Sequence, residues 1–157
     1  MSALDESARA FLSLRRLAVA GVSRDGRATA NALFRKLRDA RYEVFPVNPN
    51  AREVEGVLCY PDVGSIPGKV EGVLIATPPA ATVAVTKDCA AAGVSWIWMH
   101  RLIGRGSVAA EAVQLCRARG IHVIDGACPM MYLAPVDPFH RCFRWLLGVT
   151  GGLPKGR

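Results

Sequence analysis

The chain has 157 residues, of which 51% are hydrophobic and 21% are charged, and its net charge is +7. This length and composition fit one globular domain with a full core, and they exclude intrinsic disorder as the main state. No apolar stretch approaches the roughly 20 residues that a transmembrane helix needs. The first residues carry acids where a secretory signal needs bases, so we expect a cytoplasmic protein without a membrane partner.

Five cysteines are spread along the chain without paired spacing: Cys59, Cys89, Cys116, Cys128 and Cys142. An odd number of cysteines without a C-x-x-C pair argues against a disulfide framework and against a structural zinc site. A reducing compartment is the simplest interpretation.

Short apolar runs alternate with helical spacings, and each run ends at a turn signal. In the first half of the chain we expect a helix over 5–14, a strand over 16–22, a helix over 28–40, a strand over 42–47, a loop over 50–67 with a helical turn at 62–66, and a strand over 72–76. In the second half we expect a helix over 80–92, a strand over 95–99, a helix over 107–119, a strand over 121–125, an irregular segment over 126–138 and a helix over 139–147. Pro46 cannot donate a ladder hydrogen bond, so its strand is not expected to be central.

All five predicted strands are apolar on both faces, which is typical of a parallel sheet covered by helices on each side. The expected fold class is therefore α/β: a Rossmann-like, doubly wound parallel sheet of about five strands, with a C-terminal tail helix. We expect a single domain over 1–157, with a core at about 14–130 and a C-terminal appendage at about 131–157.

The loop after the first predicted strand resembles a phosphate-binding turn. Its sequence over 21–26 follows the pattern G-x-S-x-x-G, one substitution away from the dinucleotide fingerprint. Gly21 would allow the tight turn and Ser23 could donate to a phosphate oxygen, while the next helix directs its first N–H groups to the same place. Arg24 and Arg27 would add charge-assisted contacts. A strand-to-helix turn needs glycine even without a ligand, so the motif alone is weak evidence. Its position between the first predicted strand and the next helix is what favours phosphate binding.

The basic charge is concentrated in one segment. Residues 15–41 hold eight basic and two acidic residues, which favours a polyphosphate ligand and, less strongly, nucleic acid. A solvated helix face is the plain alternative for the bases of the second helix, Arg35, Lys36, Arg38 and Arg41. An NAD site would need an acid after the second strand, where the sequence has Pro46-Val47-Asn48-Pro49-Asn50. This weakens the case for NAD and leaves room for a nucleotide with a 3′-phosphate.

Five short motifs follow one another along the chain: Gly21-Val22-Ser23, Pro46-Val47-Asn48-Pro49, Cys59-Tyr60-Pro61, Thr77-Pro78-Pro79 and Cys128-Pro129. In this order they resemble the stand-alone CoA-binding proteins, small Rossmann-like domains similar to the CoA-binding part of the succinyl-CoA synthetase α subunit. The resemblance covers roughly residues 14–130, and P-V-N-P is its most specific part. The second domain and the phosphorylated histidine of the synthetases have no counterpart here, so their reaction is not implied.

The resemblance implies coenzyme A as the cofactor and gives each motif a part of that molecule. The pyrophosphate would be held by Gly21, Val22, Ser23 and Arg27. The ribose with its 3′-phosphate would lie near Asn48, Asn50 and Arg52. The adenine would be lined by Thr77, Pro78 and Pro79. The pantetheine would be flanked by His100 and Arg101.

Further chemistry is conceivable near the thiol end of the ligand. Zinc accepts nitrogen and sulfur ligands of the kind offered by His100, Cys128, His140 and Cys142. Their spacing fits no metal pattern, and the last two lie two residues apart on a helix, so no metal site is expected. Cys128 could form a mixed disulfide with the CoA thiol if its pKa were lowered by a base or a helix end. Burial as a small apolar side chain is the plain alternative.

Three functions remain open at this point. The leading hypothesis is a module that binds CoA or an acyl-CoA without catalysis of its own. The first alternative is an enzyme that acts on a CoA thioester or a CoA disulfide through Cys128 or His100, and the second is a ligand-sensing regulator. The helix over 139–147 has an apolar stripe that we expect to pack on the domain, with a homodimer contact as the alternative.

Overall fold

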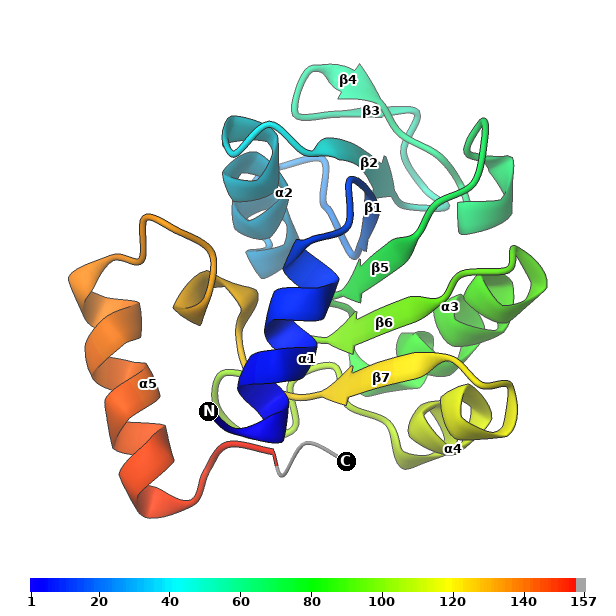
Figure 1. Ribbon diagram of the computed structural model, residues 1–157. Coiled ribbons are helices and arrows are strands. Elements are labelled where there is room, and N and C mark those ends of the chain that lie inside the picture. Colours follow the sequence, from blue (N-terminus) through cyan, green and yellow to red (C-terminus); the bar gives the residue numbers. More distant parts are fainter. Residues whose placement is uncertain (155–157) are drawn as a thin grey trace.

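The computed structural model describes residues 1–154, and its centre is a five-stranded parallel sheet (Figure 1). Its strands are β1 (Arg16–Ala20), β2 (Glu43–Val47), β5 (Gly72–Ile75), β6 (Trp96–Met99) and β7 (His122–Asp125). They are arranged in the order β2-β1-β5-β6-β7, and every pair is parallel. The predicted α/β fold with a doubly wound sheet is therefore confirmed. Pro46 lies in β2 at the sheet edge, where the missing donor is tolerated.

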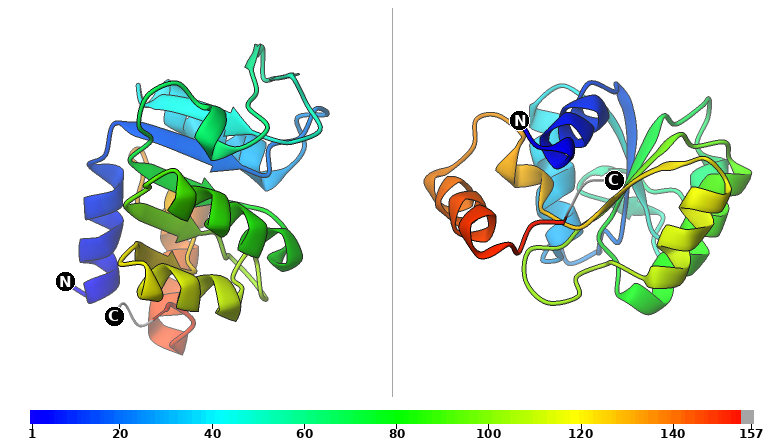
Figure 2. Two further views of the ribbon diagram at one scale, coloured as in Figure 1. Left: turned by 90° about the vertical axis from the view of Figure 1, so that its right-hand side faces the viewer. Right: turned by 60° about the horizontal axis from the view of Figure 1, so that its bottom comes forward.

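Helices cover both faces of the sheet. The helices α1 (Ala3–Leu12), α2 (Thr29–Asp39) and α5 (Pro138–Thr150) lie on one face, and α3 (Pro79–Ala91) and α4 (Ala110–Ala118) lie on the other (Figure 2). Each face has its own core, because successive strand side chains point to opposite sides. Leu17 and Val19 of β1 pack on the side of α1 and α2, whereas Ala18 and Ala20 pack toward α3 and α4.

The segment predicted as a loop over 50–67 contains a small hairpin that the sequence reading missed. Its strands β3 (Glu53–Val54) and β4 (Val57–Leu58) have two residues each and pair antiparallel. Such short strands show no alternation of apolar and polar residues. The turn residues Glu55 and Gly56 both have positive φ values, 52° and 75°, as a tight hairpin requires. The helical turn expected at 62–66 is present as η1 (Val63–Ser65).

Four helix boundaries differ from the predicted ones by two or more residues, and the first of them is the start of α1, which lies at Ala3 rather than at Asp5. The first helix ends at Leu12, where the backbone N–H of Ser13 closes the last turn. The helix α4 begins only at Ala110 rather than at Ser107, because the backbone of Ser107 is used in contacts with the β6 and α3 regions. The helix α5 continues past Leu147 as far as Thr150, and Gly151 ends it in the left-handed conformation with φ 71°.

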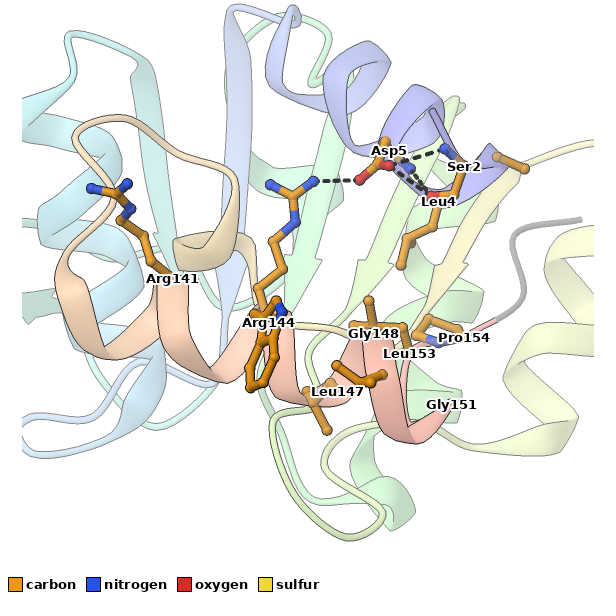
Figure 3. A pocket seen from close by; sticks show the side chains of 13 residues that line it. Ser2, Leu4, Asp5, Arg141, Arg144, Leu147, Gly148, Gly151, Leu153 and Pro154 are labelled. Atoms are coloured by element: carbon orange, nitrogen blue, oxygen red, sulfur yellow. Dashed lines mark hydrogen bonds and ion pairs between the residues drawn. The ribbon is translucent and has the colours of Figure 1, made fainter.

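The C-terminal segment begins with the short helix η2 (Pro129–Met131) and then forms α5, which confirms the predicted tail helix. The inner side of α5 packs Phe143 and Leu147 against the core on the α1 side. A hollow of about 890 Å³ separates the last turns of α5 from the start of α1, and Arg144 crosses it to pair with Asp5 at 2.6 Å (Figure 3).

The outer side of α5 is exposed and carries the large apolar side chains Phe139, Trp145, Leu146 and Val149. A homodimer contact through this helix stays a prediction. None of the helices within residues 1–154 is both long enough and apolar enough to cross a membrane.

Candidate functional site at the carboxyl ends of the strands

The predicted ligand-binding residues lie in the segments that follow the carboxyl ends of β1, β2, β5 and β6, as far as the first residue of α3. The strands β1 and β5 are neighbours in the sheet, but the chain leaves β1 through α2 on one face and β5 through α3 on the other. This is a topological switch point, where doubly wound sheets bind their ligands. The loops after β1, β2, β5, β6 and β7 therefore define the candidate site.

Gly21 sets the shape of the first loop. Its φ is +104°, and a Cβ at this position would lie 2.4 Å from the carbonyl oxygen of Ala76. Its N–H also donates to Val47 O at 3.3 Å. The loop after β1 is thus pressed between the ends of β2 and β5, and only glycine fits there.

Ser23 is held by a buried side chain of the following helix. Its backbone N–H donates to Asn31 Oδ1 at 2.7 Å, and Asn31 Nδ2 donates back to Ser23 O at 2.9 Å. The Ser23 hydroxyl donates to Asp25 Oδ1 at 2.6 Å, and the same oxygen accepts the Arg27 N–H at 3.0 Å. These two donors lower the pKa of Asp25.

Asn31 and Glu55 are two site-shaping residues that the sequence analysis missed. Asn31 is fully buried, and its side chain also donates to Glu55 Oε1 at 2.8 Å. Arg35 Nη1 reaches the same oxygen at 2.6 Å, so the tip of the β3–β4 hairpin is fastened to α2. An asparagine among the apolar positions of α2 was a readable signal for Asn31. Nothing local identifies Glu55, because its partners lie 20 and 24 residues away.

The loop after β2 is tied to the loop after β1. Asn48 Nδ2 donates to Val22 O at 2.7 Å, and Asn48 Oδ1 accepts the N–H of Asn50 at 2.8 Å. Asn48 therefore shapes the site through contacts within the chain. The side chains of Asn50 and Arg52 are exposed beside it.

The residues expected around the adenine form the start of α3. Pro78 is the N-cap residue and Pro79 is the first residue of the helix. The hydroxyl oxygen of Thr77 lies 2.9 Å from that of Thr82, whose hydroxyl donates to Ser107 O at 2.8 Å. The loops after β5 and β6 are thereby joined.

The structure separates His100 from Arg101, although they are adjacent in sequence. His100 lines a hollow of about 500 Å³ on the α2 side, together with Arg27, Thr29, Arg35, Cys128 and His140. Arg101 lines a second hollow of about 800 Å³ on the opposite side, together with Pro79, Arg105, Gln114 and Arg117. We call them the His100 hollow and the Arg101 hollow. The loop that holds Arg27 therefore lies with His100 and Cys128 at the His100 hollow. The start of α3 lies with Arg101 at the Arg101 hollow.

Cys128 is buried beneath the His100 hollow. Only 2% of its surface is exposed, and burial raises the pKa of its thiol to about 11. A thiol of this kind is mostly protonated at neutral pH, whereas a mixed disulfide with CoA needs a thiolate. Of the four zinc-ligand candidates, Cys142 is exposed and does not line this hollow. Residues 1–154 contain no group of three or more His, Cys, Asp or Glu side chains suited to a metal ion.

Thiol-labelling kinetics will test this assignment of the cysteines. We expect N-ethylmaleimide at pH 7 to modify Cys142 first, since it is the exposed cysteine, and to modify Cys128 at least about 100-fold more slowly. Peptide mass spectrometry over a time course gives the order. Labelling of Cys128 before Cys142 would contradict the burial of its thiol.

Comparison with known proteins identifies the family. The family described as CoA binding domain matches residues 15–134 of the chain. The chain belongs to this family. The matched segment includes every loop of the candidate site, and the resemblance expected from the five motifs is confirmed.

Two curated relatives show how this CoA-binding domain occurs in other proteins. The chain is 32% identical over 88 residues to the α subunit of the ADP-forming acetate–CoA ligase II of Pyrococcus furiosus. This match covers 55% of the chain and 19% of the ligase subunit. The chain is 27% identical over 114 residues to the uncharacterized protein YneT of Bacillus subtilis, covering 73% of this chain and 82% of YneT. The chain therefore spans about a fifth of the ligase subunit but most of the smaller protein.

Solved structures give the same picture. A hypothetical protein from Pyrococcus horikoshii OT3 matches with a TM-score of 0.74 and 29% identity, covering 80% of this chain and 87% of that one. The dinucleotide forming acetyl-coenzyme A synthetase 1 of Ca. Korarchaeum cryptofilum, solved with phosphate and ADP, matches with a TM-score of 0.58 and 29% identity. That match covers 69% of this chain and 25% of the synthetase.

Proposed function

We propose that the protein binds coenzyme A or an acyl-CoA, with the pyrophosphate on the loop after β1. One observation carries the proposal: the loop ends at the start of α2, whose N-terminus has no side-chain cap in the described structure. The Ala28 N–H donates to Ser23 Oγ and the Asn31 N–H to Ala28 O, which leaves the N–H groups of Thr29 and Ala30 available to an anion in the described structure. The helix dipole favours negative charge there. Within residues 1–154, Arg27 beside this helix start has no salt-bridge partner.

The surrounding loops support CoA over NAD as the ligand. The residues directly after β2, from Asn48 to Arg52, carry no carboxylate, so the ribose diol of NAD lacks its usual acceptor there. The exposed Asn50 and Arg52 offer donors to a 3′-phosphate instead. The apolar surface of Pro78 and Pro79 at the start of α3 suits the face of an adenine ring.

The basic segment gives less support to nucleic acid. Four of its eight bases are engaged within the chain: Arg16, Arg35, Lys36 and Arg38. The proposal places the protein in the cytoplasm, which fits five cysteines that are all free. A ligand-sensing role would use the same CoA site and needs a partner protein of its own.

Calorimetric titration with CoA, dephospho-CoA and NAD tests the proposal. We expect CoA to bind more tightly than the other two, because only CoA carries the 3′-phosphate. Arg27→Ala should weaken CoA binding about tenfold or more, since a charge-assisted hydrogen bond contributes roughly 1.5–3 kcal/mol. Arg119→Ala, an exposed arginine at the C-terminal end of α4, is the matched control and should bind as the wild type does. A folded wild type that does not bind CoA would overturn the proposal.

A further inference from the structure

A histidine at the edge of the His100 hollow is oriented by a carboxylate. Asp137 is the N-cap residue of α5, and its Oδ1 accepts the backbone N–H of His140 at 3.0 Å. Its Oδ2 lies 2.6 Å from Nδ1 of the His140 ring. The donors around Asp137 lower its pKa, so the group is a carboxylate at neutral pH and can only accept hydrogen bonds. Because a carboxylate can only accept, Nδ1 of His140 carries a proton, and Nε2 is the ring nitrogen left to exchange one.

The environment fixes this histidine further. Only 14% of the His140 side chain is exposed, and the ring packs against Phe139 with a centroid separation of 5.2 Å. His140 and His100 line the same hollow, although they are 40 positions apart in the sequence. Burial lowers the pKa of His100. At neutral pH His100 is therefore an uncharged imidazole that can donate one hydrogen bond.

The hollow also lies next to the proposed phosphate site. Arg27, Ala28 and Thr29, which connect the loop after β1 to α2, form part of its lining. A ligand whose pyrophosphate sits at the start of α2 can therefore extend from there toward the two histidines. Cys128 also lines the hollow, but burial raises the pKa of its thiol, so the two imidazoles are the side chains of this hollow suited to proton transfer at neutral pH.

We propose that the His100 hollow hydrolyses the thioester of an acyl-CoA, with His140 as the general base and His100 as the donor to the carbonyl oxygen. This inference rests on the proposed binding of CoA. Asp137 is a positioning residue, because it holds His140 in the tautomer and orientation that the reaction needs.

The reaction balances with water as the co-reactant. Nε2 of His140 takes a proton from water as the oxygen attacks the carbonyl carbon, and the N–H of His100 stabilises the negative charge that forms on the carbonyl oxygen. The carbon–sulfur bond then breaks, and the departing thiolate takes the proton from the His140 imidazolium. The products are a carboxylic acid and the free CoA thiol, and both histidines return to their starting state.

The test measures CoA release from acetyl-CoA and octanoyl-CoA by chromatography, beside calorimetric binding of CoA. We expect the wild type to release CoA at least about 100-fold faster than buffer, which is the low end of general-base catalysis. His140→Gln should lower kcat at least about 100-fold while it still binds CoA, and His100→Ala should lower kcat about tenfold or more. His122→Gln is the matched control, because this third histidine stacks on Trp96 outside the hollow.

Asp137→Asn separates catalysis from structure. Asparagine is as good an N-cap residue as aspartate, so α5 should keep its start. The carboxylate that fixes the tautomer of His140 is lost, so kcat should fall at least about tenfold with unchanged CoA affinity and an unchanged circular dichroism spectrum.

Each outcome decides between the two proposals. A wild type that binds CoA but releases none from either thioester overturns the hydrolysis proposal and leaves the binding proposal intact. A wild type that neither binds CoA nor hydrolyses its thioesters overturns both. Hydrolysis that persists unchanged in His140→Gln overturns the role of His140.

Discussion

Replacing Gly21 with alanine is expected to lower the free energy of unfolding by about 2–4 kcal/mol and to weaken CoA binding at least tenfold. The added Cβ would lie 2.4 Å from Ala76 O, which is backbone and cannot move aside without shifting β5. The overpacking costs about 1–3 kcal/mol, and the left-handed backbone at φ +104° adds about 1 kcal/mol for a residue with a side chain. Because the same shift displaces the loop that holds Ser23, stability and binding should fall together.

Gly93→Ala is the matched control for this prediction. Gly93 also has a positive φ, +72°, but a Cβ there would meet nothing within 4 Å. The control should therefore show the backbone cost alone, about 1 kcal/mol, with CoA binding unchanged. Urea denaturation of both variants gives the comparison. Equal losses of stability in the two variants would show that the contact with Ala76 is not what requires glycine at position 21.

The centre of the sheet was predictable because β1, β5 and β6 each hold a continuous apolar run that stops at a turn. The run before Gly21 and the run before Thr77 both end where the structure turns into a helix. Burial on both faces makes such a run apolar throughout, so its length and its ends are visible in one sequence. The edge position of β2 was visible too, through Pro46. The β3–β4 hairpin gave no such signal, because it is held by side chains of α2 and not by a core of its own.

The candidate site was predictable only as a set of loops. Parallel strands place all their carboxyl ends at one edge, which brings together residues as distant as Arg27 and His100. The contacts between these loops were not predictable. Asn31 bonds to Glu55 and Asn48 bonds to Val22 O, and both partners are far away in the sequence, so the pairs are set only by the folded positions of the loops. The separation of His100 from Arg101 follows from a simple rule: adjacent residues at a strand end point to opposite faces.

The pairing of Asp137 with His140 shows a different limit. Their i, i+3 spacing after a predicted loop is a readable helix start, with an N-cap aspartate followed by Pro138. In the sequence His140 was a candidate only as a zinc ligand, because a sequence displays its residue type but not its hydrogen-bond partner. The two hydrogen bonds to Asp137 fix the orientation of the His140 ring, and they depend on the geometry of the first turn of α5.

Replacing Trp98 with alanine is expected to cost about 3–5 kcal/mol of stability, the range for large aromatic side chains in a core. Trp98 in the middle of β6 is fully buried, its ring meets the edge of Phe11 at 5.4 Å, and its Nε1–H donates to Gly126 O at 2.8 Å. The substitution leaves both a cavity under α1 and a carbonyl without its donor. Trp145→Ala is the control on the surface, because 69% of Trp145 is exposed, and it should change stability by no more than about 0.5 kcal/mol.

A second variant connects this core residue to the site. Trp98→Phe keeps most of the apolar volume but removes the hydrogen bond to Gly126, which lies two residues before Cys128 in the lining of the His100 hollow. We expect a loss of about 1–2 kcal/mol in urea denaturation, because a buried carbonyl loses its partner. If the Gly126 contact sets the shape of the hollow, CoA thioester hydrolysis in Trp98→Phe should fall more than CoA affinity does. Unchanged hydrolysis with the same loss of stability would show that the bond to Gly126 supports the fold alone, and that the shape of the hollow comes from α2 and α5.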